Sequence, residues 1–224
     1  FYLVRSGCAW RMLPREYPPH QTVYHYFRQW RNDGTWERIH ACLREQVRHR
    51  KGREPTPSAA VLDSQSIKIA EQRGWRGYDG GKKVHGRKRH LLVDTEGLVL
   101  KVIVSPAHIT DRTGAEVLLE LVASSVPRLT KIWADYSYRG KLVTWVRERF
   151  GWDLTIVTHP WAGLKGVWAK DGTVIDWATI RPAGFHVLPR RWVVERTFGW
   201  INHSRRLRTD YESLLSSSEA MIYL

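Results

Sequence analysis

The chain has 224 residues, of which 42% are hydrophobic, so it can bury the core of one large domain. Lysine and arginine outnumber aspartate and glutamate by 36 to 22, which gives a formal net charge of +14 and an isoelectric point of about 10.1. This surplus favours an extended polyanion, nucleic acid first, as the partner. A membrane partner is disfavoured, because no apolar run approaches the roughly 18 residues of a spanning helix.

The cysteine content argues against secretion and against a structural zinc site. Cys8 and Cys42 form neither a paired framework nor a C-x-x-C motif, and we recognise no signal peptide. A reducing interior is therefore expected. The chain starts at Phe1 without an initiator methionine and stops in AMIYL, so we also expect natural sequence to be missing at both ends.

Residues 1–53 are predicted to form a small, basic helical subdomain. The prolines of WRMLPREYPPH interrupt any helix there. Beyond them, apolar residues recur at intervals of three and four on both sides of an Asp-Gly turn at Asp33 and Gly34, which indicates two helices. With 11 lysines and arginines against 4 acids, the segment either carries solvated charges or contacts DNA directly.

Residues 54–224 show the pattern of an α/β domain. After a linker in KGREPTPSAA come three β-rich runs, with a turn at Gly97, that predict an antiparallel meander: 59–70, 89–97 and 98–107. The elements expected after them are a helix at 110–125, a strand at 130–138, a helix at 139–150, a strand at 153–158 and a late helix around Glu195. This order predicts a mixed sheet covered by helices.

Two aspartates interrupt apolar strands of this layout, Asp63 in AVLDS and Asp135 in IWADYS. A buried carboxylate is costly unless it is paired, hydrogen-bonded or bound to metal. Asp63 could simply bond its own turn, and Asp135 could cap the following helix. However, the ends of the first and fourth strands are neighbours in such a sheet, so the two carboxylates would repel each other unless cations lay between them. Mg²⁺, a hard ion that takes oxygen ligands, suits this pair.

The late helix contains one acid among many bases. Six arginines surround Glu195 in RRWVVERTFGWINHSRRLR. At about 100° per residue, Glu195 falls beside the apolar face that would cover the sheet, on a ridge with Arg191. It could therefore reach the strand ends and complete a metal site, while the arginines hold flanking phosphates. The alternative is a surface helix of ion pairs. The predicted DNA contacts here are Arg190, Arg191, Arg196, Arg205 and Arg206.

A second basic block, GGKKVHGRKRH, precedes the predicted second strand and has no acid. It is either a solvated loop or, beside a metal site, a set of phosphate contacts. Its histidines lack the Cys/His spacing of a zinc site. The predicted DNA contacts in this block are Lys82, Lys83, Arg87, Lys88 and Arg89.

The stretch at about 159–188 is predicted to be an irregular insertion, with a hairpin in VWAKDGTVIDW. Its tryptophans, Trp161, Trp168 and Trp177, either pack internally or stack on unpaired bases.

Several of these motifs together resemble the DDE transposases of bacterial insertion sequences, in the group called insertion-sequence-five-like. The similarity extends over nearly the whole chain, in SGCAWRMLP, TVYHYFRQWRNDGTWERI, AAVLDSQS, RGYDGGKKVHGRKRHLLVD, IWADYSY and VLPRRWVVERTF, followed by RRL and DYE. Long motifs in the same order are far more specific than three acids at loose spacing.

The resemblance implies an RNase H-like catalytic domain at 54–224 in which Asp63, Asp135 and Glu195 match the acidic triad. It implies two Mg²⁺ ions, with Mn²⁺ as a substitute, that serve attack on phosphodiesters by water and then by a liberated 3′-hydroxyl. The expected partners are double-stranded element ends and target DNA, bound by a homodimer in the bacterial cytoplasm or nucleoid. No membrane or protein partner is expected, and no covalent protein–DNA intermediate.

The chain departs from related insertion-sequence enzymes in the late helix. Those enzymes carry a Tyr, an Arg three residues on, the Glu, and a Lys seven residues further. Arg191 and Glu195 fit, but Leu188 stands at the Tyr position and Asn202 at the Lys position. We expect handling of DNA ends to fall instead to Arg196, His203 or Arg205. Two alternatives remain: a DNA-binding protein without activity, and an RNase H-like nuclease that cleaves but does not join.

Overall fold

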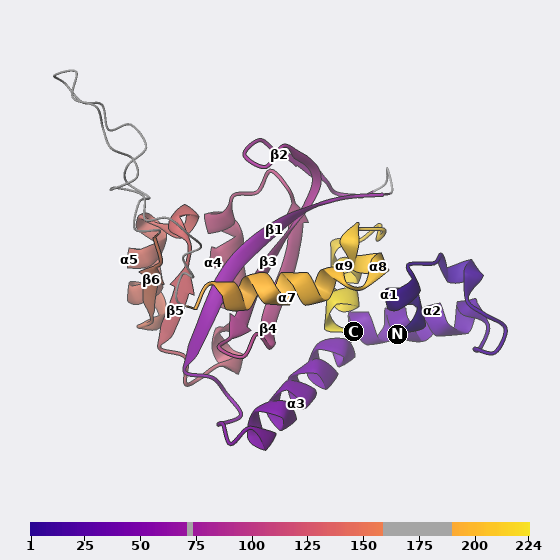
Figure 1. Cartoon of the computed structure of the whole chain (residues 1–224), viewed down its shortest axis with the longest axis horizontal. Coiled ribbons are helices and arrows are strands. Elements are labelled where there is room, and N and C mark those ends of the chain that lie inside the picture. The colour runs from indigo at the N-terminus through magenta and orange to yellow at the C-terminus, as the bar shows by residue number, and fades with distance from the viewer. Residues whose placement is uncertain (71–73, 159–189) are drawn as a thin grey trace, which may run out of the picture.

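A computed structural model describes residues 1–70, 74–158 and 190–224 as a mixed sheet with helices on both faces (Figure 1). This arrangement confirms the predicted α/β class and is consistent with an RNase H-like fold preceded by N-terminal helices. The strands are β1 (Ala59–Lys68), β2 (Gly77–Asp79), β3 (Val84–Asp94), β4 (Val99–Pro106), β5 (Lys131–Ala134) and β6 (Asp153–Ile156).

The sheet runs in the order β4, β3, β1, β5, β6, and the short β2 pairs with the start of β3. β1, β3 and β4 are antiparallel, which confirms the predicted meander, and Gly97 takes a φ of +85° in the turn between β3 and β4. β5 and β6 then continue the sheet parallel to β1. The carboxyl end of β5 therefore lies beside the middle of β1, near Asp63, whereas the ends of these two strands were expected to be neighbours.

The basic block differs from the prediction, because most of it is strand and not a loop before the strand. β3 begins at Val84 and pairs with β1 on one side and with β4 on the other. Successive side chains of a strand point to opposite faces of the sheet, so the charged side chains of this block are divided between the cores on its two faces. A charge run alone does not reveal such a division.

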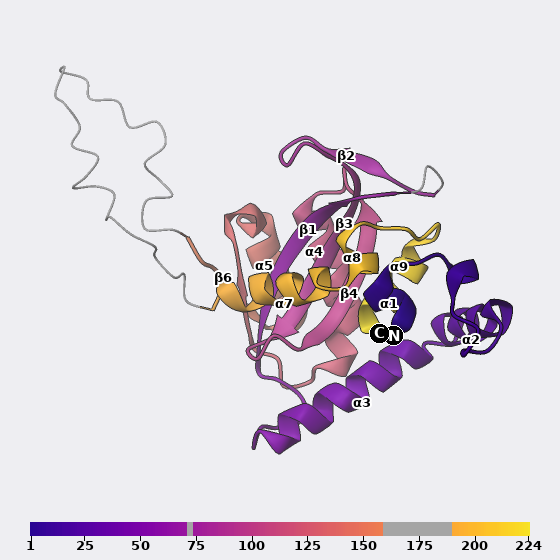
Figure 2. The same cartoon turned by 45° about the vertical axis from the view of Figure 1, so that its right-hand side comes forward.

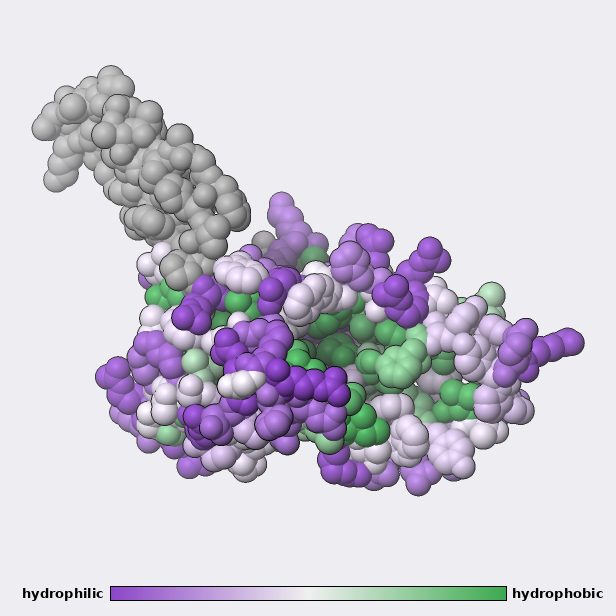
Figure 3. All heavy atoms as spheres, turned by 60° about the horizontal axis from the view of Figure 1, so that its bottom comes forward, coloured by the Kyte–Doolittle hydropathy of each residue, from purple (hydrophilic) through white to green (hydrophobic). Residues whose placement is uncertain are grey.

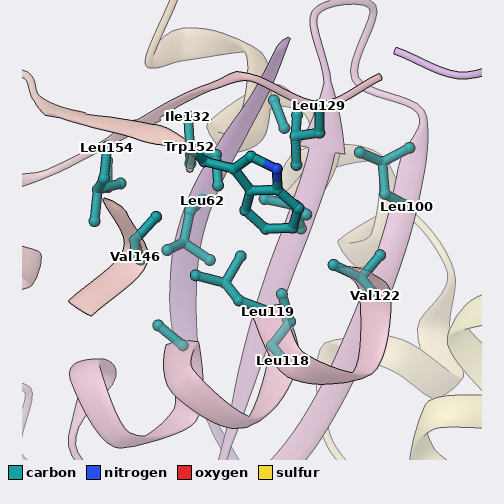
Figure 4. Packing of buried hydrophobic residues seen from close by; sticks show 14 of the residues in the cluster. Leu62, Leu100, Leu118, Leu119, Val122, Leu129, Ile132, Val146, Trp152 and Leu154 are labelled. Carbon is teal, nitrogen blue, oxygen red and sulfur yellow. The ribbon is translucent and has the colours of Figure 1, made fainter. Parts of the chain in front are cut away.

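One face of the sheet is covered by α4 (Asp111–Val122) and α5 (Lys141–Phe150). Thr110 caps α4 by accepting a bond from the N–H of Thr113 at 3.2 Å. Figure 4 shows the core beneath these helices, where Trp152 lies among leucine, isoleucine and valine side chains from the strands and from α4 and α5. Even-numbered residues of β1, such as Leu62, point to this side.

The opposite face is covered by α7 (Trp192–Asn202) and α9 (Leu215–Tyr223), with the short α8 (Arg205–Arg208) between them (Figure 2). Val61 and Leu91 of the sheet pack here against Val194 and Phe198 of α7. Since Val61 points to this side, Asp63 on the same strand does so too.

The N-terminal helices are α1 (Tyr2–Ser6), α2 (His20–Asn32) and α3 (Thr35–Arg50), with the Asp33–Gly34 turn where it was expected. Val4 and Phe27 belong to the same core as Met221 of α9, and α1 packs against α8. The segment therefore shares a core with the C-terminal helices. A cavity of about 420 Å³ with apolar walls lies between α2 and α9, and hydrophobic side chains gather in a hollow on the face shown in Figure 3.

The turn between β3 and β4 contacts helices from both ends of the chain. Asp94, at the end of β3, forms a buried ion pair with Arg48 of α3. Gly97 accepts a hydrogen bond at its carbonyl from the Thr197 hydroxyl of α7, with an O···O distance of 2.8 Å. α3 and α7 are thus both fixed to one short turn. Among the described helices, none is long and apolar enough to cross a membrane.

Candidate active site

Three carboxylates from three elements meet where the carboxyl end of β5 lies beside the middle of β1. Asp63 lies in β1 and points to the α7 side of the sheet. Val61 is paired with Trp133 of β5, so Asp135, directly after β5, lies beside Asp63 on the same side. Glu195 lies in the first turn of α7, which crosses this face. The sequence placed Asp135 within a strand, whereas the strand ends one residue earlier.

Arg191, immediately before α7, joins the three acids. One guanidinium nitrogen, Nη2, lies 3.2 Å from Asp63 Oδ2 and 3.1 Å from Glu195 Oε1, and the other, Nη1, lies 3.1 Å from Asp135 Oδ2. The sequence predicted the contact with Glu195, one helical turn away, but not those with the two aspartates. Arg190, the preceding residue, takes a φ of +71°, a region that side chains with a Cβ rarely adopt.

The second oxygen of each aspartate is held by its own neighbourhood. Asp63 Oδ1 accepts the N–H of Ser64 at 2.7 Å. Asp135 Oδ1 accepts the N–H of Ser137 at 2.9 Å and also the Ser137 hydroxyl, and so caps the 3₁₀ turn Tyr136–Tyr138. Both aspartates thus make local hydrogen bonds beside the convergence, but not the ones considered from the sequence: Asp63 lies in a strand and not in a turn, and Asp135 caps the 3₁₀ turn and not α5, whose N-cap is Gly140. The Asp-x-Ser spacing typical of such a cap could have identified Ser137.

The three acids of the site carry more negative charge than Arg191 neutralises. Burial raises the pKa of Asp63 above its ordinary value, and the positive charge of Arg191 opposes that rise. The side chains become more exposed from Asp63 (14%) to Asp135 (31%) to Glu195 (59%), so the site opens toward α7. With all four groups ionised, three negative charges face one positive charge.

The donor set of this site suits a hard divalent cation. Three carboxylate oxygens, Oδ2 of both aspartates and Oε1 of Glu195, already surround one cationic group, and Mg²⁺ and Mn²⁺ prefer such oxygen ligands. As the side chains lie, no group of three His, Cys, Asp or Glu residues in the described ranges is spaced to hold a metal ion. The guanidinium of Arg191 lies between the three acids.

Four of the predicted DNA contacts are exposed: Lys82, Lys83, Arg190 and Arg205. Lys82 lies near Asp63, since its Nζ donates to the carbonyl of the next residue, Ser64, at 3.2 Å. Arg196 is half-buried, with its guanidinium 4.6 Å and 4.5 Å from the ring centres of Trp192 and Trp200. Cations thus lie on both sides of the carboxylates, along the β2–β3 segment and along α7.

Arg191, also predicted to contact DNA, is held by the three acids. The remaining four predicted contacts are buried: Arg87, Lys88, Arg89 and Arg206. Arg87 pairs with Asp210 at 3.1 Å, and Arg206 pairs with Glu212 at 2.7 Å. These side chains present no surface to a phosphate, so the structure contradicts the prediction of DNA contact for them. A buried charge needs internal partners, and those of Arg87 are the nearby Trp75 carbonyl and groups more than 120 residues away in sequence.

A polar network next to Asp63 was not predicted. Lys88 lies between Asp111, at 3.0 Å, and Asp79, at 3.4 Å. The Ser64 hydroxyl donates to Asp111 at 2.7 Å, so the network reaches the residue that follows Asp63. Acids spread over separate elements give no local signal in the sequence. The predictions for Trp161, Trp168, Trp177, the 159–188 hairpin and Leu188 lie outside the described residues.

Comparison with protein families matches residues 54–224 to the family described as Transposase DDE domain. Residues 1–40 match a family of transposases of the IS4/5 type. A search of curated proteins and a search of solved structures gave no significant match. DDE transposases are DNA-acting nucleases or transferases that generally use divalent metal ions. Since the first match covers well over half of the sequence, the chain belongs to the DDE transposases of the IS4/5 type.

Proposed function

We propose that this transposase cleaves DNA at the ends of its insertion element and joins the liberated 3′ ends to target DNA. Asp63, Asp135 and Glu195 are the catalytic and metal-binding residues in this proposal. The observation that supports it most is the convergence of these three acids on one cation within 3.2 Å, where the carboxyl end of β5 lies beside the middle of β1.

In this proposal the three carboxylates hold two divalent ions, Mg²⁺ or Mn²⁺. The ions would polarise the scissile phosphate and lower the pKa of an attacking water. Asp63 and Asp135 contribute rigid ligands, because internal hydrogen bonds fix their Oδ1 atoms and leave Oδ2 facing the centre. Glu195, the most exposed of the three, closes the site from α7.

Two displacements would follow at this site. Water first attacks the phosphorus at the element end, which breaks the bond to the 3′ oxygen and leaves a 3′-hydroxyl and a 5′-phosphate. The 3′-hydroxyl then attacks a target phosphate and releases another 3′ oxygen as the leaving group. Lys82, Arg190 and Arg205 are exposed where they can neutralise flanking phosphates.

We further propose that residues 1–53 assist DNA binding while 54–224 form the catalytic domain. We expect a homodimer on DNA, since joining two ends in one event needs two active sites, and we expect the reaction to take place in the bacterial cytoplasm. Sedimentation of the protein with and without element-end DNA measures the oligomeric state.

The test is nicking of supercoiled plasmid by the chain with Mg²⁺, Mn²⁺ or EDTA. Asp63→Asn, Asp135→Asn and Glu195→Gln should each reduce metal-dependent nicking by at least about 100-fold, because each removes a charged ligand. Glu120→Gln is the matched control, since Glu120 is an acid on the exposed side of α4, paired with Arg149.

Binding to plasmid DNA is measured in parallel by fluorescence anisotropy. Nicking by the three variants at the wild-type rate would show that the triad is wrong. Wild-type DNA binding without nicking in any metal would favour the DNA-binding protein without activity. Nicking without joined products, when an oligonucleotide of the element end is supplied, would favour a nuclease that does not join.

A further inference from the structure

Arg191 is a cation in the middle of the site that the proposed chemistry does not use. Its guanidinium forms ion pairs with all three acids at 3.1–3.2 Å, and its side chain is only 13% exposed. An exposed pair between Arg191 and Glu195, four residues apart, would be an ordinary helix contact. The contacts with Asp63 and Asp135 are not of this kind, because they connect α7 to two separate strands.

Arg191 occupies the carboxylate oxygens that a metal ion would need. The Oδ1 atoms of Asp63 and Asp135 accept backbone N–H groups, so Oδ2 is the oxygen that faces the centre in each. Arg191 takes both of these Oδ2 atoms. Mg²⁺ binds carboxylate oxygens at about 2.0–2.1 Å, so an ion on the same oxygens would overlap the guanidinium.

The two cations also repel each other. A divalent ion and a guanidinium that share one set of oxygens lie a few ångströms apart, a distance well below the Debye length of about 8–10 Å, so salt screens their repulsion only in part. A metal ion and the guanidinium therefore cannot occupy these oxygens together, because they would overlap and because both are positively charged. The exposed end of the site, at Glu195, gives the guanidinium a direction in which to leave.

We propose that Arg191 acts as an internal substitute for the metal: it holds the three carboxylates together in the metal-free protein and competes with divalent ions for them. This inference rests on the proposed function, which makes the acids metal ligands. When metal binds, the guanidinium leaves the carboxylates and becomes free to hold a DNA phosphate, which it can bind through two parallel N–H groups. Arg191 is thus a positioning residue whose release couples metal binding to DNA binding.

The main test measures the affinity for Mn²⁺ without DNA, from the electron paramagnetic resonance signal of the free ion. Wild type is compared with Arg191→Gln, and Arg149→Gln on α5 is the control with the same loss of charge. Arg191→Gln should bind Mn²⁺ about tenfold more tightly than wild type, in the range of ordinary coupling between sites. Arg149→Gln should match wild type, because its partner Glu120 lies on α4.

A second measurement, the melting temperature, shows whether Arg191→Gln is folded without metal. In EDTA, Arg191→Gln should unfold at a lower temperature than wild type, since three carboxylates then lack their cation, and Mn²⁺ should raise its melting temperature more than it raises that of wild type. Arg191→Lys keeps the charge but lacks the fork that bridges several carboxylates. Its Mn²⁺ affinity should lie between those of wild type and Arg191→Gln.

The coupling to DNA is tested by repeating the Mn²⁺ titration with a short duplex. DNA should tighten Mn²⁺ binding more in wild type than in Arg191→Gln, because only wild type has a guanidinium to transfer to phosphate. Equal tightening in both would overturn the coupling.

The outcomes separate this inference from the proposed function. Wild type that binds Mn²⁺ and an Arg191→Gln variant that binds it no more tightly would overturn the competition and leave the metal-binding triad in place. Absence of Mn²⁺ binding by both proteins, with and without DNA, would overturn the triad as a metal site and the competition with it.

Discussion

His90 is a titratable residue that is fully buried in the interior of the protein. Its ring lies in β3 against α4, and Nε2 is 2.9 Å from the Ser105 hydroxyl. Burial lowers the pKa of His90 from 6.5 to about 4; Asp111 opposes this shift and Lys88 adds to it. His90 is therefore neutral in the folded protein under conditions in which an exposed histidine begins to take up a proton.

We expect His90 to make the protein less stable in mild acid. A depressed pKa in the folded state contributes stability that is present above pH 6.5 and is lost as the pH falls toward about 4. Between pH 7 and pH 5 this amounts to about 2 kcal/mol. Urea unfolding at both pH values should show a smaller loss for His90→Gln than for wild type. The same loss in both would contradict the prediction, and His49→Gln, at an exposed position, is the control.

The sequence was sufficient to predict the three acids of the site, but not the contacts of Arg191 with the two aspartates. Asp63 and Asp135 are recognisable because a charge inside an apolar strand is unusual, and Glu195 because it is alone among arginines. The contact of Arg191 with Asp63 spans 128 residues and depends on how α7 crosses the sheet. The burial of Arg87 was missed for the same reason, because its partner Asp210 is 123 residues away; the partner of Arg206, Glu212, lies only six residues further along the chain and was overlooked.

At the scale of elements, helix α4 approaches strand β3 unusually closely at Gly114. A Cβ on Gly114 would overlap the ring of His90, which is fully buried and cannot move aside. Gly199 of α7 is the opposite case, since a Cβ there meets nothing within 4 Å. Both glycines lie in helices, but only at Gly114 does the packing leave no room for a side chain.

We expect alanine to have opposite effects at these two glycines. Gly114→Ala should lower the free energy of unfolding by about 1–3 kcal/mol through overpacking. Gly199→Ala should raise it by about 0.5–1 kcal/mol, because alanine loses less backbone entropy in a helix. Guanidinium chloride unfolding of both variants measures the difference. A Gly114→Ala protein as stable as wild type would mean that α4 can move away from β3.

Most elements were predictable from local sequence, whereas the basic block was not. Short β-rich runs identified β1 and β4, and apolar residues at helical spacing identified α2 and α3. The block at 84–90 is polar on both faces of β3 because each face meets acids from distant elements. No period in hydrophobicity could have identified it as strand.

At the scale of the whole molecule, the net charge of +14 overstates the charge available to DNA, because several cations are internal. The positively charged residues that are buried in the described ranges are Arg44, Arg48, Arg87, Lys88, Arg89 and Arg206. The salt dependence of DNA affinity should therefore come from the exposed cations near the acids. It should be weaker than the composition of the chain alone suggests.

The salt dependence of DNA affinity distinguishes local binding from overall charge. In the double variant Lys82→Gln/Lys83→Gln, the slope of log K against log salt should become shallower by about 0.9 for each phosphate that the protein no longer neutralises. Arg147→Gln/Arg149→Gln removes the same charge from exposed positions on α5, which covers the other face of the sheet from α7. Anisotropy titrations at several salt concentrations measure both slopes. Equal changes would show that only net charge matters.

The turn between β3 and β4 gives this molecule an internal mechanical connection. α3 is attached to it through Arg48 and Asp94, and α7 through Thr197 and Gly97. In the proposed complex, a displacement of the N-terminal helices by bound DNA would reach the helix that carries Glu195 through this turn, without deforming the sheet.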